Sequence, residues 1–286
     1  MDIDLENAIS DASSLKQVAF VLKYKMSSFL SRKLDNKDRN NYLCSMNLAS
    51  QMRTRIKKLP EGKTFGYADL RLAKEQYQAA AKALERMQTK GLIKKISKGV
   101  FYKPEQSVFG ELKPDYREQL RPYLFENGKR VAYETGYSLY NRMGLTTQIA
   151  YRIKIASRSK RISINRGSLK ADAIKSYAEV NEANYELLGL LDAIKDIKNI
   201  PDCTVRKALK IVSYQISKLN EKQIADLVKY ALLYPPRVRA LVGALLESLN
   251  IQAKTEKLKQ SLNPLTKVKL GLKKSDLQTT TDWYIA

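Results

Sequence analysis

The stretch that decides the fold runs from Lys74 to Lys103 and reads KEQYQAAAKALERMQTKGLIKKISKGVFYK. With a period of 3.6 residues, its first half predicts a helix with a small or apolar side and a polar side. The side expected to face the core consists of Tyr77, Ala80, Ala81, Leu84, Met87 and Gln88. The opposite side carries Glu75, Gln78, Ala79, Lys82 and Arg86. The helix is therefore predicted to be amphipathic, with a mainly polar outer face.

Gly91 follows this helix where a glycine with positive φ commonly ends one. Two short strands are predicted next, at residues 92–96 and 100–103, with a turn at Gly99 and a stop at Pro104. A helix followed at once by a basic hairpin is typical of the second half of a winged helix-turn-helix. The alternative is an ordinary helix and hairpin whose lysines are solvated.

The preceding residues favour the winged helix. Residues 52–59 read as the end of a helix, 64–65 as a minimal strand and 67–70 as a single helical turn. In a winged helix, the second helix of the pair enters the major groove and the wing follows the backbone. The whole segment, 46–106, contains fourteen lysines and arginines against five acids, an excess of nine. That excess suits phosphate contacts.

The composition of the whole chain points to a polyanionic partner. Its 286 residues contain 52 Lys and Arg against 29 Asp and Glu, which gives a charge of +23 and favours nucleic acid over membrane. There is no histidine, so His-dependent acid–base catalysis, nucleophile systems and metal sites are excluded. The two cysteines, Cys44 and Cys203, are expected to be buried free thiols.

The flanking segments do not suggest export or membrane insertion. The acidic N-terminus does not resemble a signal peptide, and the longest apolar run, residues 240–246, is too short to cross a bilayer. We therefore expect a cytoplasmic protein with no membrane partner. Residues 1–45 are predicted to form a helical extension, packed against its own winged domain or serving as a partner surface.

The rest of the chain predicts a second, α+β domain at 107–250. A linker at 107–114 leads to helices at 116–123 and 131–143, and then to strands of a hairpin or small sheet at 150–156 and 161–165. From residue 181 the pattern is helical, with four apolar stripes that end near Leu249 and are expected to form a bundle core. Residues 251–286 are predicted to be a basic tail, with a mobile arm at 254–274.

A second basic segment lies at residues 151–170, which contain no acid. It could be a phosphate-binding surface or a solvated strand face, and the sequence favours neither. Its cations are Arg152, Lys154, Arg158, Lys160, Arg161, Arg166 and Lys170.

No motif indicates catalysis. The glycine-rich loops that cradle nucleotides are missing. Asp192 and Asp196 are spaced as metal-binding carboxylates could be, but beside Lys195 and Lys198 on an amphipathic helix they are interpreted as a solvated face. No catalytic residue, metal site or cofactor is predicted, and the protein is expected not to be an enzyme.

Three blocks of the sequence resemble one family. They are RIKKLPEGKTF at 55–65, ALERMQTKGLIKKISKGVF at 83–101 and TGYSLYNRMGLTTQ at 135–148. Together they resemble the AbiEi-type antitoxins of type IV toxin–antitoxin (abortive infection) systems, over about residues 50–250. Many regulators share the wing motif, so its combination with GLTTQ is the more specific feature. The helical extension and the bulky Tyr77 early in the recognition helix depart from the family pattern.

The resemblance implies a DNA-binding autorepressor that also counters a nucleotidyltransferase-like toxin. Its expected partners are duplex operator DNA with inverted repeats and, if the resemblance extends so far, the cognate toxin. DNA contacts are expected on the recognition helix and wing, at Lys74, Gln78, Lys82, Arg86, Lys94, Lys95 and Lys98.

These inferences define one expected architecture and leave two rival functions open. The fold is expected to be mainly α with small β elements, a winged helix-turn-helix followed by an α+β, largely helical domain. One rival function is a metal-dependent nuclease with a winged-helix targeting module. The other is a protein that binds RNA or DNA without regard to sequence. Metal-dependent cleavage would indicate the first rival, and sequence-independent affinity the second.

Overall fold

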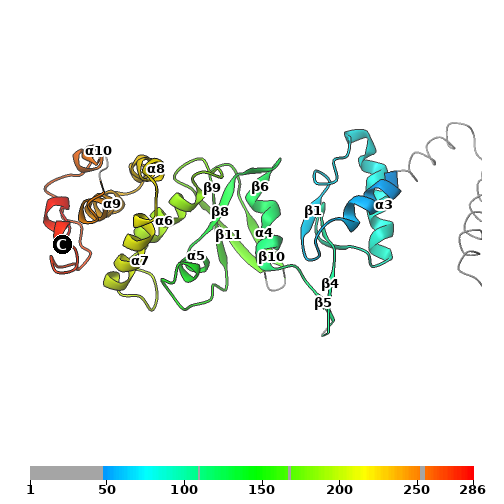
Figure 1. The fold of residues 1–286 in the computed structure, drawn as a ribbon, viewed down its shortest axis with the longest axis horizontal. Helices are drawn as coiled ribbons and strands as arrows, with labels where there is room; N and C mark the ends of the chain where they lie inside the picture. Colours follow the sequence, from blue (N-terminus) through cyan, green and yellow to red (C-terminus); the bar gives the residue numbers. More distant parts are fainter. Residues whose placement is uncertain (1–47, 109, 167–168, 252–254) are drawn as a thin grey trace, which may run out of the picture. The chain divides into compact units, whose positions relative to one another are not determined.

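The structure is a computed structural model that describes residues 48–108, 110–166, 169–251 and 255–286 (Figure 1). The backbone divides into two compact units, Met1–Gln119 and Leu120–Ala286. The predicted extension at 1–45 lies outside the described residues. Within the described part of the chain, no helix is both long enough and apolar enough to cross a membrane.

Two helices form the core of the first unit. Residues 48–57 form one, and α3, Tyr77–Thr89, forms the other after the 3-10 turn η2, Lys74–Gln76. Met52 and Leu84, from the two helices, are buried in the same apolar cluster. Gly91 follows α3 with φ of 69°, so the predicted end of the helix is confirmed.

The buried face of α3 is rotated from the predicted one. Ala83 is buried, whereas Tyr77 and Ala81, which were predicted to face the core, are exposed. Tyr77 packs instead against Tyr67, with ring centroids 5.4 Å apart. The prediction failed because alanines stand at four of the five positions 79–83, and a methyl group carries little hydrophobic signal. The buried residues of α3 are Ala80, Ala83, Leu84 and Met87.

Three short antiparallel strands accompany these helices, close to the predicted positions. They are β1 (Thr64–Gly66), β2 (Lys94–Ser97) and β3 (Val100–Tyr102), in the order β1-β3-β2. Gly99, with φ of 74°, makes the turn between β2 and β3. The helical turn predicted at 67–70 is a set of hydrogen-bonded turns instead. Arg55 holds it by donating to the backbone oxygens of Leu70 and Arg71.

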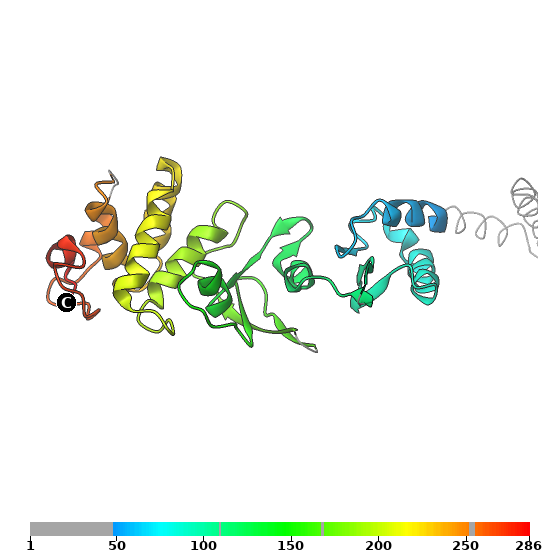
Figure 2. The same ribbon diagram turned by 60° about the horizontal axis from the view of Figure 1, so that its bottom comes forward.

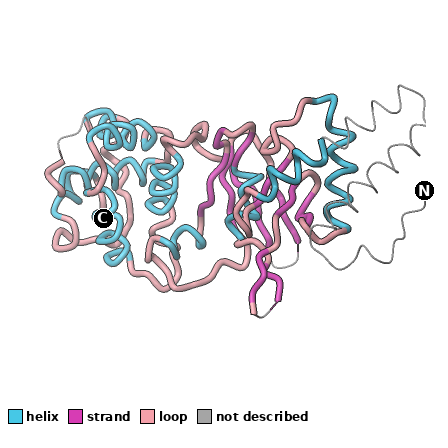
Figure 3. The backbone as a smooth tube through the Cα atoms, turned by 45° about the vertical axis from the view of Figure 1, so that its right-hand side comes forward, coloured by secondary structure: helices cyan, strands magenta, loops and turns pink. Residues whose placement is uncertain are grey.

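A second hairpin stands where a linker was predicted at 107–114. Its strands, β4 (Glu105–Ser107) and β5 (Gly110–Leu112), project from the unit in Figures 1 and 3. The linker prediction was wrong because three-residue strands are too short to give an alternating signal. What fixes the hairpin is a contact distant in sequence, from Glu111 to Lys94 and Tyr102.

A mixed four-stranded sheet organises the second unit. Its strands are β8 (Ala132–Thr135), β9 (Ile153–Ser157), β10 (Ser163–Arg166) and β11 (Leu169–Lys175). The order is β10-β11-β9-β8, with β9 parallel to β11 and the other pairs antiparallel. Strands were predicted near β9 and β10. Strand β11, which lies between these two in the sheet, was not predicted. A hairpin whose strands have two residues each, β6 (Phe125–Glu126) and β7 (Lys129–Arg130), precedes this sheet in the chain.

The helix predicted at 131–143 is a strand followed by a shorter helix. Strand β8 ends at Thr135, Gly136 has φ of 72°, and α5 runs from Tyr137 to Arg142. The single-helix prediction was wrong because a positive φ at Gly136 breaks a helix at that point.

The two faces of the sheet have different cover. Against one face lies α4 (Tyr116–Leu124), whose Leu120 packs in a cluster with Ile153, Ile155 and Ile164. Against the other face lies α6 (Tyr185–Lys195), whose leucines share the main core with Tyr133 and Ala156.

The predicted helical region of the second unit is confirmed (Figure 2). After α6 come α7 (Val205–Ser217), α8 (Glu221–Ala231) and α9 (Pro236–Ser248). The side chain of Thr204 caps α7, and Asn220 with Gln223 forms the capping box of α8.

The segment predicted as a basic tail is part of the folded unit. Over residues 255–286 the structure places α10 (Glu256–Gln260) and the 3-10 helix η3 (Gln278–Trp283). Trp283 is 1% exposed. A Cβ added at Gly243 of α9 would lie 2.1 Å from its ring, so α9 and Trp283 are in direct contact. The tail prediction was wrong because the apolar residues that anchor this segment follow no regular period.

Candidate nucleic-acid interface

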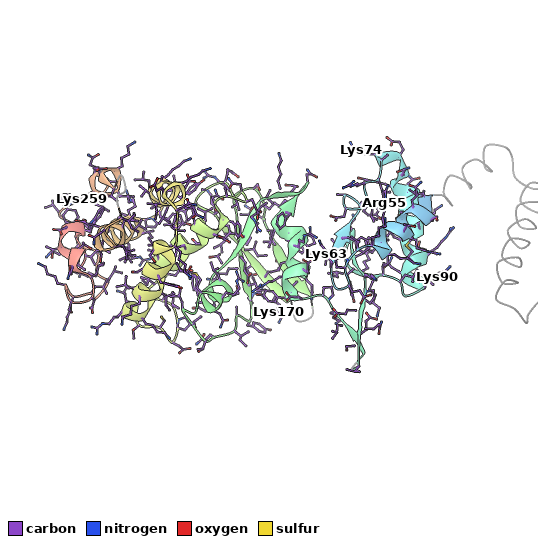
Figure 4. The ribbon with its side chains drawn as sticks, viewed as in Figure 1. Arg55, Lys63, Lys74, Lys90, Lys170 and Lys259 are labelled. Carbon is purple, nitrogen blue, oxygen red and sulfur yellow. The ribbon has the colours of Figure 1, made fainter. Side chains whose placement is uncertain are left out.

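The outer face of α3 carries four of the predicted DNA-binding residues. Gln78, Lys82 and Arg86 are exposed, opposite the buried Leu84, and Lys74 is exposed on η2 just before the helix. Figure 4 labels Lys74, which precedes α3, and Lys90, which follows the other end of the helix. Within the described part of the chain, Lys82 and Arg86 form no ion pair. This face therefore presents two exposed cations on a regular helix, without an ion pair to another described residue.

The β2–β3 hairpin holds the other three predicted residues, which are not equivalent. Lys95 and Lys98 are exposed, and neither pairs with an acid among the described residues. Lys94 Nζ lies 2.6 Å from Glu111 Oε2, and this hydrogen bond raises the pKa of Lys94 above its ordinary value. The three lysines were predicted to act alike, but Lys94 differs from the other two because β5 brings Glu111 back to β2.

The second predicted basic surface is divided between two ends of the sheet. Arg152 donates to Asp172 and Lys154 lies on β9, whereas Arg158 and Lys160 follow the end of β9. Arg158 lies 3.6 Å from Glu179, and Lys160 lies 3.3 Å from Glu126. These acids come from outside residues 151–170, so the local sequence could not reveal them. Arg161 is exposed after β9, and Arg166 ends β10.

Asp192 is buried, so its interpretation as part of a solvated face was wrong. Its side chain is 2% exposed, and its carboxylate accepts hydrogen bonds from Tyr133 at 2.9 Å, Thr135 at 2.8 Å and Tyr234 at 3.1 Å. Lys195 lies 3.4 Å away. Burial and then the charge of Asp192 raise the pKa values of Tyr133 and Tyr234 above their ordinary range. The sequence hid this network because its donors lie on β8 and beyond α8.

This hydrogen-bond network connects strand β8 of the sheet with helices α5 and α6. Tyr140 of α5 adds hydrogen bonds to the backbone oxygen of Asp192 and to the carboxylate of Asp196. A buried charge with hydrogen-bond partners on several elements fixes their mutual positions. Within the described residues, no group of three His, Cys, Asp or Glu side chains could hold a metal ion. Cys203 is a partly buried free thiol whose pKa is raised by burial.

The sequence matches the model of one known protein family. Residues 51–211, more than half of its 286 residues, match the model of a family of unknown function, DUF6088. The chain therefore belongs to this family. No curated protein matches it.

One solved structure shows a distant similarity. The crystal structure of the RV2827C protein from Mycobacterium tuberculosis is 13% identical, with a TM-score of 0.44. The similarity covers 78% of this chain and 83% of that one.

Proposed function

We propose that the first unit is a winged helix-turn-helix that binds duplex DNA, and that the protein is a transcriptional autorepressor and antitoxin of a type IV toxin–antitoxin system. The observation that carries the DNA-binding part is the exposed charge of Lys82 and Arg86 on α3, together with Lys95 and Lys98 on the adjoining hairpin, none of which forms an ion pair with another described residue. The sheet order β1-β3-β2 beside two helices supports the same proposal.

The two elements take different parts in the proposed complex. α3 enters the major groove, where Arg86 can donate two hydrogen bonds to guanine and Gln78 can pair with adenine. The β2–β3 hairpin follows the backbone, where Lys95 and Lys98 meet phosphates. Lys94 contributes less, because Glu111 already neutralises it.

The antitoxin part rests on the resemblance of residues 55–65, 83–101 and 135–148 to AbiEi-type antitoxins. The proposed partner is a nucleotidyltransferase-like toxin, encoded beside this protein. A reading frame for such an enzyme immediately downstream would support this part strongly.

Fluorescence anisotropy with duplex DNA from upstream of the gene tests the DNA-binding part. Specific binding to this duplex over a scrambled one is expected, and K82A/R86A should abolish the preference. Lys222, exposed on α8 of the other unit, supplies the control K222A, which should bind as the parent does. Equal affinity for both duplexes, or unchanged binding by K82A/R86A, would reject the proposal.

A further inference from the structure

The second unit leaves half of one sheet face uncovered. Lys154 pairs with Asp172, Asp172 with Ser163, and Lys170 with Asn165 in the strand register. Paired residues, and residues two apart on a strand, project from the same face. We name this surface the open sheet face, and it consists of Arg152, Lys154, Ser163, Asn165, Lys170 and Asp172, all exposed or half-buried.

The same face is covered at its other half. Tyr133 of β8 and Ala156 of β9 are register partners, and both are buried in the core that includes α6. Ala156 lies two residues beyond Lys154 on β9 and so projects from the same side. The helices therefore end partway along the sheet, and the polar half beyond them is open to solvent.

Exposed tyrosine rings adjoin the open sheet face. Tyr151, which leads into β9, is 74% exposed, and Lys170 Nζ lies 4.2 Å from its ring centroid. Tyr137, at the start of α5, is 42% exposed, and Lys154 Nζ lies 5.9 Å from its ring. Ile149 in the intervening loop is 92% exposed. Each ring contacts a lysine of the open sheet face, and exposed apolar groups beside a polar surface are typical of an interaction site.

We propose that the open sheet face, with Tyr137 and Tyr151, binds single-stranded nucleic acid. Arg152, Lys154 and Lys170 outnumber the single acid, Asp172, so the surface suits a phosphate backbone. Unpaired bases can stack on exposed rings beside a basic track. A duplex keeps its bases stacked inside, so it could use the cations but not the rings.

Only part of this surface is evident from the sequence. Arg152, Lys154 and Lys170 stand out by their charge, whereas nothing in the sequence marks the two rings as exposed. The proposal does not depend on duplex binding by the first unit.

Binding of fluorescein-labelled single strands of about 12 nucleotides to the full chain, followed by anisotropy, tests the proposal. RNA and DNA strands of the same sequence show which sugar is preferred. Y137A/Y151A should weaken single-strand binding by about tenfold or more and leave duplex binding unchanged. K154Q/K170Q should weaken it and reduce its salt dependence.

Two controls keep the result interpretable. Y137F/Y151F keeps both rings and should bind single strands within about twofold of the parent, whereas K82A/R86A should lose only duplex binding. Thermal unfolding of each variant confirms that it is folded. Parental single-strand affinity in Y137A/Y151A would overturn the proposal. A second outcome would also overturn it. If poly-glutamate displaced the strand equally well from the parent and from Y137A/Y151A, the surface would be assigned to an acidic protein partner.

Discussion

The carboxylate of Glu111 lies 2.6 Å from the Nζ of Lys94 and thereby joins two hairpins of the first unit. Glu111 also accepts a hydrogen bond from Tyr102, at 3.4 Å. An acid of the β4–β5 hairpin thus stands beside the β2–β3 hairpin, which is proposed to follow the DNA backbone. It neutralises one of three lysines and would itself repel a phosphate.

Replacing Glu111 should therefore strengthen DNA binding. E111Q removes one negative charge and frees Lys94, so we expect higher affinity for duplex DNA and a salt dependence steeper by about one unit. Anisotropy titrations at several salt concentrations measure both effects. E105Q, on the same hairpin but without an ion pair among the described residues, is the matched control. A parental salt slope in E111Q would mean that Lys94 does not reach the DNA.

Leu84 tests which face of α3 is inside. It is 1% exposed, so L84A should lower the free energy of unfolding of the first unit by about 2–5 kcal/mol. K82A, on the exposed face, should change it by less than about 0.5 kcal/mol. Urea denaturation measures the two values. Equal stabilities would show that the outer face has been misassigned and would remove Lys82 and Arg86 from the proposed interface.

The tyrosines around Asp192 predict a loss of stability at high pH. Burial and the nearby carboxylate raise the pKa values of Tyr133 and Tyr234, whereas tyrosines of the unfolded chain titrate near pH 10. Their contribution is fully present below about pH 10 and is lost as the pH rises further, because only the unfolded state then releases these protons. Urea denaturation between neutral and alkaline pH measures the slope.

A variant assigns this slope to the network. Y234F removes the hydroxyl that donates to Asp192, so it should cost about 1–3 kcal/mol at neutral pH and lose stability less steeply above pH 10. Y214F, at a ring 58% exposed, should match the parent throughout. An unchanged alkaline slope in Y234F would assign the loss to other groups.

Regular periodicity predicted α3, the β2–β3 hairpin and helices α6 to α9, because each is encoded within a dozen neighbouring residues. What the sequence could not give is contact between distant segments. The acids that meet Lys94, Arg158 and Lys160 stand elsewhere in the chain, and a run of cations without local acids therefore overstated the free charge.

The prediction of a basic tail at residues 251–286 was wrong for a related reason. Residues such as Leu258, Leu270 and Trp283 are buried, but they are widely spaced among polar residues and follow neither helical nor strand spacing. Packing of α10 and η3 against α9 makes this segment part of the main core. Tyr151 shows the converse case, since a lone aromatic residue in a polar segment does not reveal whether it is exposed.

The two proposed activities should be separable. The second unit has its own core around α6 to α9, and it contains neither Lys82 nor Arg86. If protection lies there, K82A/R86A should lose operator binding and still rescue cells from toxin expressed from an independent promoter. That promoter is needed because loss of repression would otherwise raise both proteins together. Cell survival at matched protein abundance, measured by immunoblot, is the readout. Failure to rescue would mean that protection works through DNA binding, and the protein would then be proposed as a repressor alone.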